Sequence, residues 1–352
     1  MTQQAGPDAP DPDEAQRAIE YCYEQGWSDG LPLVPASKPL VDAFLATTSR
    51  EPDEIIGSLE QVGRDCTVYL AAVNAAMAGC KPEYFPVVLA AFDALMRERA
   101  ARGGGFQSTS GPAPLIVVNG PVRHELGFNT AGGAFGPGFR PNMTISRAIG
   151  LIVRNAFGIR PHVLEQATQG VPGRWSICIA ENEEESPWEP LAANAGQPGV
   201  SAVSVTLTRT AEFVDNRHTP HAEQVLWDIA DTIARIGCLI FKEQGVAVVL
   251  CPEHAQMFAA AGYTKQDVQD WLIDHSVRTG RDLRLAGKNG LHGRGRFGSD
   301  DTSQDEVLSR VLPGSRRDVP VIVAGAKNAA ISMVVRIFGE WSGIATPVGE
   351  KL

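Results

Sequence analysis

Short, strongly apolar segments alternate along the chain with segments of helical length, and this alternation constrains the fold more than any other feature. Apolar runs typical of buried strands occupy residues 114–120, 174–181, 202–210, 246–251 and 319–325. Helix-length segments follow or separate them, at 143–158, 221–237, 252–262 and 264–277. Strands that alternate with helices favour an α/β fold, or a mixed α+β fold, with the elements arranged in two lobes.

Helices are also expected outside this alternating region. Residues 13–26 form a short predicted helix, and a helical hairpin is expected over 66–79 and 82–100. Gly79 suits the end of the first hairpin helix and Pro82 the start of the second. A last helix is predicted across 328–338, before a short β segment near 344–348. No internal repeat is evident in the sequence.

The length of 352 residues suggests two lobes or one large domain, at roughly 150 residues per domain. Residues 1–12 are rich in Pro, Asp and Gln and are predicted to be a disordered tail. Residues 13–192 form the expected N-terminal lobe and residues 193–352 the expected C-terminal α/β lobe. Within the latter, residues 280–318 hold seven glycines and little periodicity, which predicts a mobile loop.

Charge and composition exclude several classes of protein. The formal net charge of −10 argues against a nucleic-acid partner, which needs a basic surface. The sequence shows neither a secretory signal at its start nor an apolar run of 18 residues, so neither export nor a membrane partner is expected. Six scattered cysteines without a Cys-x-x-Cys pair do not make a disulfide framework. We therefore expect a cytoplasmic globular protein.

A glycine-rich loop at 127–142, leading into the helix at 143–158, is the first candidate binding site. Its glycines allow close approach to a ligand, and the helix start favours an anion. The candidate substrate-binding residues are Gly132, Gly133, Gly136, Gly138, Arg140, Asn142, Thr144 and Arg147. The alternative is a tight structural loop with solvated arginines.

Cys80 is the candidate nucleophile. It precedes the predicted helix start at Pro82 and is followed by Lys81, and both neighbours favour a thiolate. The alternative is a small buried side chain at a helix–helix corner. Cys251 lies in an apolar context, where a packing role is expected, and His254 is expected to be a structural histidine.

An acidic cluster follows the strand at 174–181. Glu181 and Glu183 are the candidate proton-transfer residues, because carboxylates at a strand end can act as general acid and base. Together with His218 and His221 the cluster can alternatively be a metal site. A third interpretation is a solvated turn, since most charge runs are solvated.

Four segments resemble a known bacterial family. They are GWSDGLPLVP, VNAAMAGCKPEYFPVVLAA, GPGFRPNMTISRAI and VPGRWSICIAENEEESPWEPL, all within about residues 26–200. The family comprises poorly characterised proteins that accompany, or are fused to, UGSC-type (seleno)protein domains. The resemblance implies that the four segments converge on one site and that a UGSC-type protein is a partner.

Three functions are compatible with these features. The first is a hydrolase or lyase acting on a small anionic substrate, with Cys80 as nucleophile and Glu181 or Glu183 transferring protons. The second is a metal-dependent hydrolase or lyase, and the third is a non-catalytic subunit of a redox (seleno)protein system. The sequence indicates no cofactor. A homo-oligomer is expected from the size of the chain alone.

Overall fold

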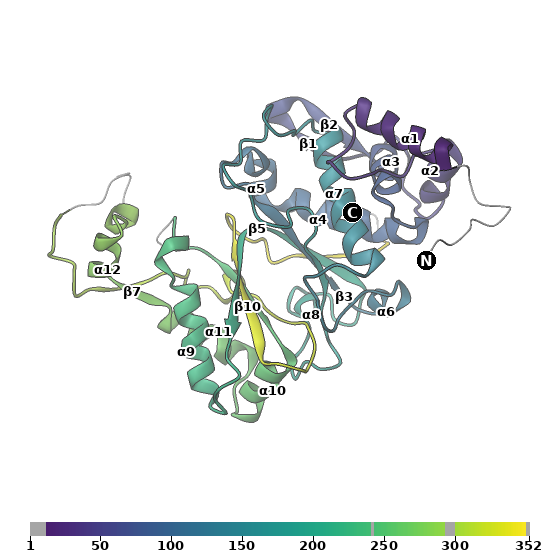
Figure 1. The fold of residues 1–352 in the computed structure, drawn as a ribbon. Helices are drawn as coiled ribbons and strands as arrows, with labels where there is room; N and C mark the ends of the chain where they lie inside the picture. The colour runs from purple at the N-terminus through teal and green to yellow at the C-terminus, as the bar shows by residue number, and fades with distance from the viewer. Residues whose placement is uncertain (1–11, 241–242, 293–299, 350–352) are drawn as a thin grey trace.

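The computed structural model describes residues 12–240, 243–292 and 300–349, in which a large mixed sheet lies between two groups of helices (Figure 1). Its strands are β3 (Ala113–Asn119), β4 (Cys178–Ala180), β5 (Ala202–Asp215), β6 (Val246–Leu250), β9 (Val321–Val323), β10 (Ile331–Ile337) and β11 (Ala345–Pro347). Their order is β4–β3–β5–β10–β6–β9, and β11 pairs with the start of β5. The predicted α/β fold is confirmed.

The sheet is built from two halves with the same topology. In the first half β3 pairs in parallel with β4 and antiparallel with β5, and in the second β6 pairs in parallel with β9 and antiparallel with β10. The two halves meet where β5 pairs antiparallel with β10. The structure therefore contains an internal repeat that is not evident in the sequence.

The predicted helix across 328–338 is wrong, because this segment forms β10 at the centre of the sheet. Its side chains alternate between two apolar environments: Val334 packs against helices, whereas Val335 and Ile337 point into the interior of the sheet. Alternation with β-branched residues at most positions is typical of a strand buried on both faces. The β segment expected near 344–348 is confirmed as β11.

Helices of the first half cover the outer face of β3, β4 and the start of β5 (Figure 1). They are α1 (Pro12–Glu24), α2 (Lys38–Leu45), α3 (Val68–Ala78), α4 (Phe85–Arg97), α5 (Arg99–Arg102), α6 (Val122–Glu125) and α7 (Arg140–Asn155). The short helix α8 (Leu191–Asn194) lies elsewhere, with Leu191 packed in the interior of the sheet. The hairpin β1 (Ile55–Leu59) and β2 (Arg64–Thr67), which was not predicted, precedes α3. As expected, Gly79 ends α3 in the left-handed conformation, with φ of 86°.

Helices of the second half are α9 (Ala222–Ile233), α10 (Pro252–Ala260), α11 (Lys265–His275) and α12 (Gly280–Leu285). Thr264 caps α11 in a complete capping box with Asp267. The segment 280–318, expected to be a loop, contains α12 and the strand β8 (Leu308–Arg310), which pairs with β7 (Val277–Thr279). Residues 293–299 of that segment, like residues 1–11 of the predicted tail, lie outside the described residues.

The sheet is continuous across the expected lobe boundary at 192/193, since β3 and β5 pair along their length. Along each strand, side chains point alternately toward the covering helices and toward an interior that the two halves of the sheet share. In β6, for example, Val248 packs against the helices of the second half, whereas Ala247 and Val249 face the interior together with Val117 of β3. The sheet thus curls around one apolar interior that both halves build.

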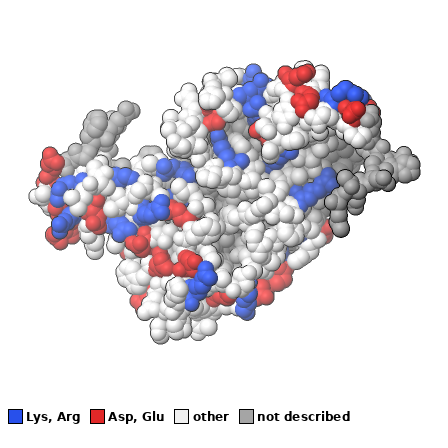
Figure 2. Space-filling model, in the orientation of Figure 1, with Lys and Arg blue, Asp and Glu red and all other residues white. Residues whose placement is uncertain are grey.

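Lys, Arg, Asp and Glu side chains are interspersed on the face shown in Figure 2, including the extension that carries α12 and β7. Ion pairs hold this extension, such as Arg284 with Asp305 at 2.7 Å and Arg278 with Asp231 at 2.8 Å. Among the described residues no helix has both the length and the apolar character needed to cross a membrane.

Candidate functional site

The curl of the sheet brings the carboxyl ends of its two edge strands together. The backbone N–H of Asn182, just after β4, donates to the carbonyl of Val323 in β9 at 2.7 Å. The Asn182 side-chain amide donates to the carbonyl of Gly325 at 3.2 Å, and the N–H of Gly325 donates to the carbonyl of Thr130. In α/β proteins ligands bind most often at the carboxyl ends of strands, so this junction is where a site is expected.

A hollow of about 440 Å³ opens at this junction, and we call it the Cys251 hollow. Its walls are the loop 132–136, the carboxyl end of β6, the segment 324–329 and the start of β10, with Phe213 of β5 at its side. Most lining side chains are apolar, and none of the described residues that line it carries a charge. It has the size and character of a pocket for a small, largely apolar molecule.

Among the described residues that line the hollow, Cys251 is the one whose side chain can act as a nucleophile. It follows β6 directly and is the N-cap of α10, with Pro252 at the first helical position. The backbone N–H groups of His254 and Glu253, in the first turn of the helix, act to lower the pKa of its thiol. Burial nonetheless raises the pKa of the thiol, which is 3% exposed, so the resting sulfur is protonated.

Ser332 and His254 connect to this thiol in a buried chain of hydrogen bonds. Ser332 Oγ, from β10, lies 3.7 Å from Cys251 Sγ and accepts a hydrogen bond from the Cys251 backbone N–H at 3.1 Å. The same oxygen lies 2.7 Å from His254 Nδ1, and His254 Nε2 lies 2.9 Å from the backbone carbonyl of Asn216. His254 and Ser332 are both nearly inaccessible to solvent.

The direction of these hydrogen bonds follows from Asn216. A carbonyl oxygen can only accept, so His254 Nε2 must carry the proton. In the neutral ring Nδ1 is then an acceptor and takes a hydrogen bond from the Ser332 hydroxyl, whose oxygen also lies 3.7 Å from the Cys251 sulfur. Burial lowers the pKa of His254 and keeps the resting ring neutral. These contacts therefore link Cys251 through Ser332 to a buried, neutral imidazole.

Glu181 is fully buried at the carboxyl end of β4. One of its oxygens accepts from the Asn119 side chain at 2.7 Å and from the Leu191 backbone N–H at 2.8 Å, and the other from the Val323 N–H at 3.4 Å. Burial raises the pKa of Glu181 and lowers that of nearby Lys265. These contacts tie β3, β4 and β9 together, so the geometry supports a structural role.

The remaining acidic side chains form an ion-pair network at the surface. Arg123, which is buried, binds Glu183 at 3.0 Å and Glu184 at 2.9 Å, and His124 lies 2.9 Å from Glu184. The hydrogen bond from Arg123 is the main reason why the pKa of Glu184 falls to about 2. Glu183 also accepts from the Gly120 N–H at 2.8 Å. The network fixes the turn after β4 against the turn after β3.

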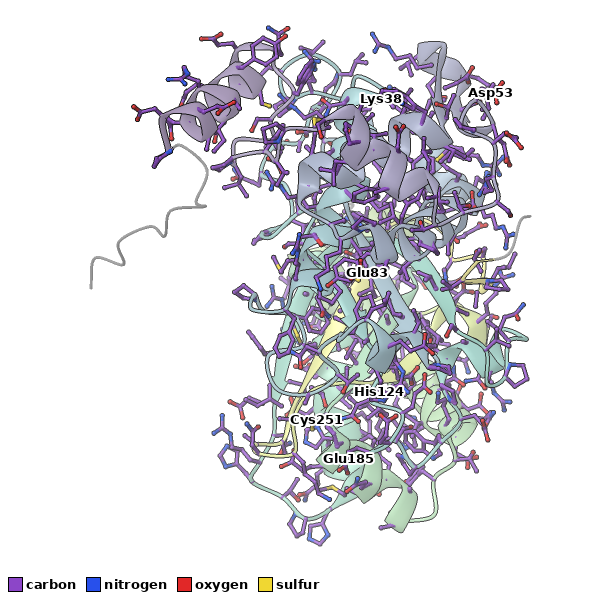
Figure 3. All side chains as sticks on the ribbon, turned by 90° about the vertical axis from the view of Figure 1, so that its right-hand side faces the viewer. Lys38, Asp53, Glu83, His124, Glu185 and Cys251 are labelled. Carbon is purple, nitrogen blue, oxygen red and sulfur yellow. The ribbon has the colours of Figure 1, made fainter. Side chains whose placement is uncertain are left out.

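Figure 3 places His124, Glu185 and Cys251 toward the same end of the molecule, and Lys38 and Asp53 at the opposite end. Glu185 connects the acidic turn to the rim of the Cys251 hollow. Its carboxylate accepts from Gln256 of α10 at 2.9 Å and lies 4.0 Å from Lys327, whose neighbours in the chain line the hollow. The acidic cluster thus supports the hollow from outside.

Cys80 lies on the helical side of the sheet. It is 5% exposed and packs in the apolar core of the first half, which also contains Cys178 and Ala180 of β4. Ile179 faces the opposite side, and Glu181 continues that alternation toward the interior. Cys80 and Glu181, expected in one site, therefore lie on different faces of β4. Burial raises the pKa of Cys80 to about 12, although Thr144 and Arg140 favour the thiolate.

Most of the expected anion ligands on α7 have partners within the protein. Arg147 forms two hydrogen bonds with Asp29, at 2.8 and 2.9 Å, and also donates to backbone carbonyls of the loop after Gly30. Arg140 donates to the Gly79 carbonyl at 2.9 Å. Asn142 is buried and donates to the Cys178 carbonyl at 3.0 Å. These contacts bring all four resembling segments together, since α7 begins in one of them and Asp29, Gly79 and Cys178 lie in the other three.

The glycine-rich loop is divided between two environments. Gly132, Gly133 and Gly136 line the Cys251 hollow. Gly138 lies just before α7 with φ of 127°, a conformation open to glycine but strained for other residues. Thr144 donates to the Arg140 carbonyl at 2.7 Å, within the first turn of α7.

Cys251, Ser332 and His254 were not among the expected site residues. A signal for Cys251 exists in the sequence, because a cysteine between a buried strand and a Pro-initiated helix lies at a helix N-terminus. No such signal exists for Ser332, which lies in the segment where a helix was predicted.

The described residues contain no group of three or more His, Cys, Asp and Glu side chains arranged to hold a metal ion. The alternative metal site of Glu181–Glu185 with His218 and His221 thus finds no support in their arrangement.

Comparison of this chain with protein-family profiles, with curated proteins and with solved structures found no match.

Proposed function

We propose that the protein is a hydrolase that uses Cys251 as its nucleophile on a small, uncharged and largely apolar substrate with an activated acyl group. The single observation that carries the proposal is the chain from Cys251 through Ser332 to His254, which begins at the wall of the hollow and ends at a buried base. A nucleophile next to a base that a third group orients is the arrangement shared by acyl-transfer enzymes.

The reaction starts with proton transfer along this chain. The Cys251 proton passes to Ser332 as the Ser332 proton passes to His254 Nδ1, while the sulfur attacks the substrate carbonyl carbon. The tetrahedral adduct collapses, and the leaving group departs with the proton returned through Ser332. Water then attacks the thioester, gives its proton to the same base and releases the acid, and the thiol is restored. Atoms and charges balance in each half-reaction.

Two features support stabilisation of the developing charges. The Asn216 carbonyl accepts from Nε2 and holds the imidazolium that forms at His254. The glycine loop 132–136 lines the same hollow, and glycine-rich backbone can present N–H groups to an oxyanion.

The uncharged substrate is a departure from the anion expected from the sequence. Arg147 is engaged by Asp29, Arg140 donates to a backbone carbonyl, and neither lines the Cys251 hollow. A charged substrate would lose its hydration there without an ionic partner, which is costly.

Hydrolysis of p-nitrophenyl acetate tests the proposal. We expect Cys251→Ala to abolish turnover, because the thioester cannot form without the sulfur. Cys80→Ala, a matched change in a second buried cysteine, should retain the wild-type rate. Full activity in Cys251→Ala, or its loss in Cys80→Ala with an intact fold by circular dichroism, overturns the assignment of the nucleophile.

The homo-oligomer, the cytoplasmic location and the UGSC-type partner remain proposals from the sequence. Size-exclusion chromatography with light scattering tests the first, and co-purification with a UGSC-type protein tests the last.

A further inference from the structure

A second hollow, of about 320 Å³, lies at the opposite end of β9 from the Cys251 hollow. Val321, at the start of β9, lines the second hollow, whereas Ala324, just after its end, lines the first. The packed interior of the sheet, with Ile322 and Val335, separates the two. We call the second one the Trp341 hollow. Nothing in the proposed hydrolysis uses it.

Buried polar groups without partners gather beside this hollow. Trp341 lines it and is 6% exposed, and its indole Nε1–H is buried with no acceptor among the described residues. Trp341 also lines an adjoining space of about 10 Å³ with Ser204 and Thr206 of β5, whose hydroxyls are likewise buried without partners. A buried donor that lacks an acceptor costs free energy, so such groups usually mark the place of a bound partner or a functional role.

The shape of the small space limits what can fill it. Leu191, Pro320 and Trp341 line both spaces, so the small one directly adjoins the hollow. Its volume is about that of one oxygen-sized group. An indole N–H can only donate, and hydroxyls can donate as well, so the group that enters must be an acceptor.

Basic and amide side chains line the outer part of the hollow. Arg317 is 56% exposed and its guanidinium lies 4.0 Å from Asp318, at the limit of ion-pair range, which leaves most of its N–H groups available. Arg316 is held by Asp270 instead. Gln266 contributes a side-chain amide to the lining. A carboxylate matches this arrangement, because one oxygen can enter the inner space while the other pairs with Arg317.

We propose that the Trp341 hollow binds a small carboxylate, with one oxygen accepting from Trp341 Nε1–H and the charge neutralised by Arg317. The site is independent of the proposed Cys251 chemistry, since the two hollows share no lining residue. It gives the chain a second ligand, of a charge class that the Cys251 hollow does not accept.

Titration of the ¹⁵N-labelled protein with sodium acetate tests this site, with the indole N–H resonances as the signal. Trp341→Phe identifies the Trp341 resonance by its loss. We expect that resonance to shift downfield and to saturate, whereas the Trp227 resonance, from an exposed indole on α9, stays unchanged. Sodium chloride at equal ionic strength is the salt control.

Arg317→Gln and Arg310→Gln form a matched pair of variants. Both arginines are just over half exposed, but Arg310 pairs with Asp274 outside the hollow. We expect Arg317→Gln to weaken acetate binding at least tenfold and Arg310→Gln to leave it unchanged. An acetate shift that is absent, does not saturate, or is equally weak in both variants overturns the site. The binding should persist in Cys251→Ala, which separates this result from the fate of the proposed hydrolase.

Discussion

Removal of the Ser332 hydroxyl should damage both stability and catalysis. In Ser332→Ala the Cys251 backbone N–H loses its acceptor and His254 Nδ1 loses its donor, at 3.1 and 2.7 Å respectively. Both groups are buried where water cannot replace the lost partner. An orphaned buried polar group costs about 1–3 kcal/mol, so the free energy of unfolding should fall by about 2–6 kcal/mol.

Ser276→Ala is the matched control for this loss. The Ser276 hydroxyl is also fully buried, but it has no hydrogen-bond partner among the residues that the structure describes, so its removal breaks no hydrogen bond seen there. We expect the urea midpoint of this variant, followed by far-UV circular dichroism, to stay near that of the wild type. Equal midpoints for Ser332→Ala and Ser276→Ala would contradict the hydrogen-bond chain.

The catalytic effect of Ser332→Ala is measured separately from its effect on stability, by ester hydrolysis. General acid–base assistance contributes about 10²–10⁴-fold to rates, so p-nitrophenyl acetate hydrolysis in the folded variant should fall within that range. Ser276→Ala should keep its activity. A Ser332→Ala protein that is destabilised but hydrolyses the ester at the wild-type rate would leave the chain with a structural role only.

Further predictions concern the base, the loop around α7 and a tight turn. Burial lowers the pKa of His254, so wild-type kcat/KM should stay level as the pH falls through 6.5 and decline only below it, where the ring becomes protonated. In His254→Asn this decline at acid pH should vanish, and the rate should drop about 10²–10⁴-fold. Arg147→Ala should lower the free energy of unfolding by about 2 kcal/mol through loss of its charged hydrogen bonds to Asp29, without changing ester hydrolysis; loss of hydrolysis in a folded protein contradicts this. Gly120→Ala should lower the melting temperature more than Gly127→Ala, because both glycines have positive φ but only at Gly120 does the new Cβ meet backbone, at 2.5 Å; equal shifts contradict it.

The sequence was sufficient to predict the junction that carries Cys251. The apolar run 246–251 and Pro252 indicate a buried strand followed by a helix, and the structure has β6 and α10 there. The junction's partner was missed because Ser332 lies 81 residues later, in a segment where a helix was predicted. Local propensity did not distinguish a buried strand from a buried helix, since both are continuously apolar. Only the pairing of β10 with β6 brings Ser332 to Cys251.

The arginines on α7 are residues that the sequence did predict as ligands but that already have partners within the protein. Their place at a predicted helix start after a glycine-rich loop predicted an anion site, and the sequence alone carries no information on a partner 118 residues away. Asp29 supplies the negative charge to Arg147 from within the chain. Unlike these arginines, Gly132, Gly133 and Gly136 do line a hollow, because the loop that joins β3 to α7 must pass the carboxyl end of the sheet.

The most direct measurement is the site of acylation in the intact protein. After brief exposure to p-nitrophenyl acetate and an acid quench, peptide mass spectrometry should find one acetyl group on the peptide that contains Cys251, labile to hydroxylamine as a thioester is. The same adduct should be missing from Cys251→Ala and present in Cys80→Ala. Ester hydrolysis at an undiminished rate with acetyl groups on Cys80, or on lysines alone, would contradict the central claim.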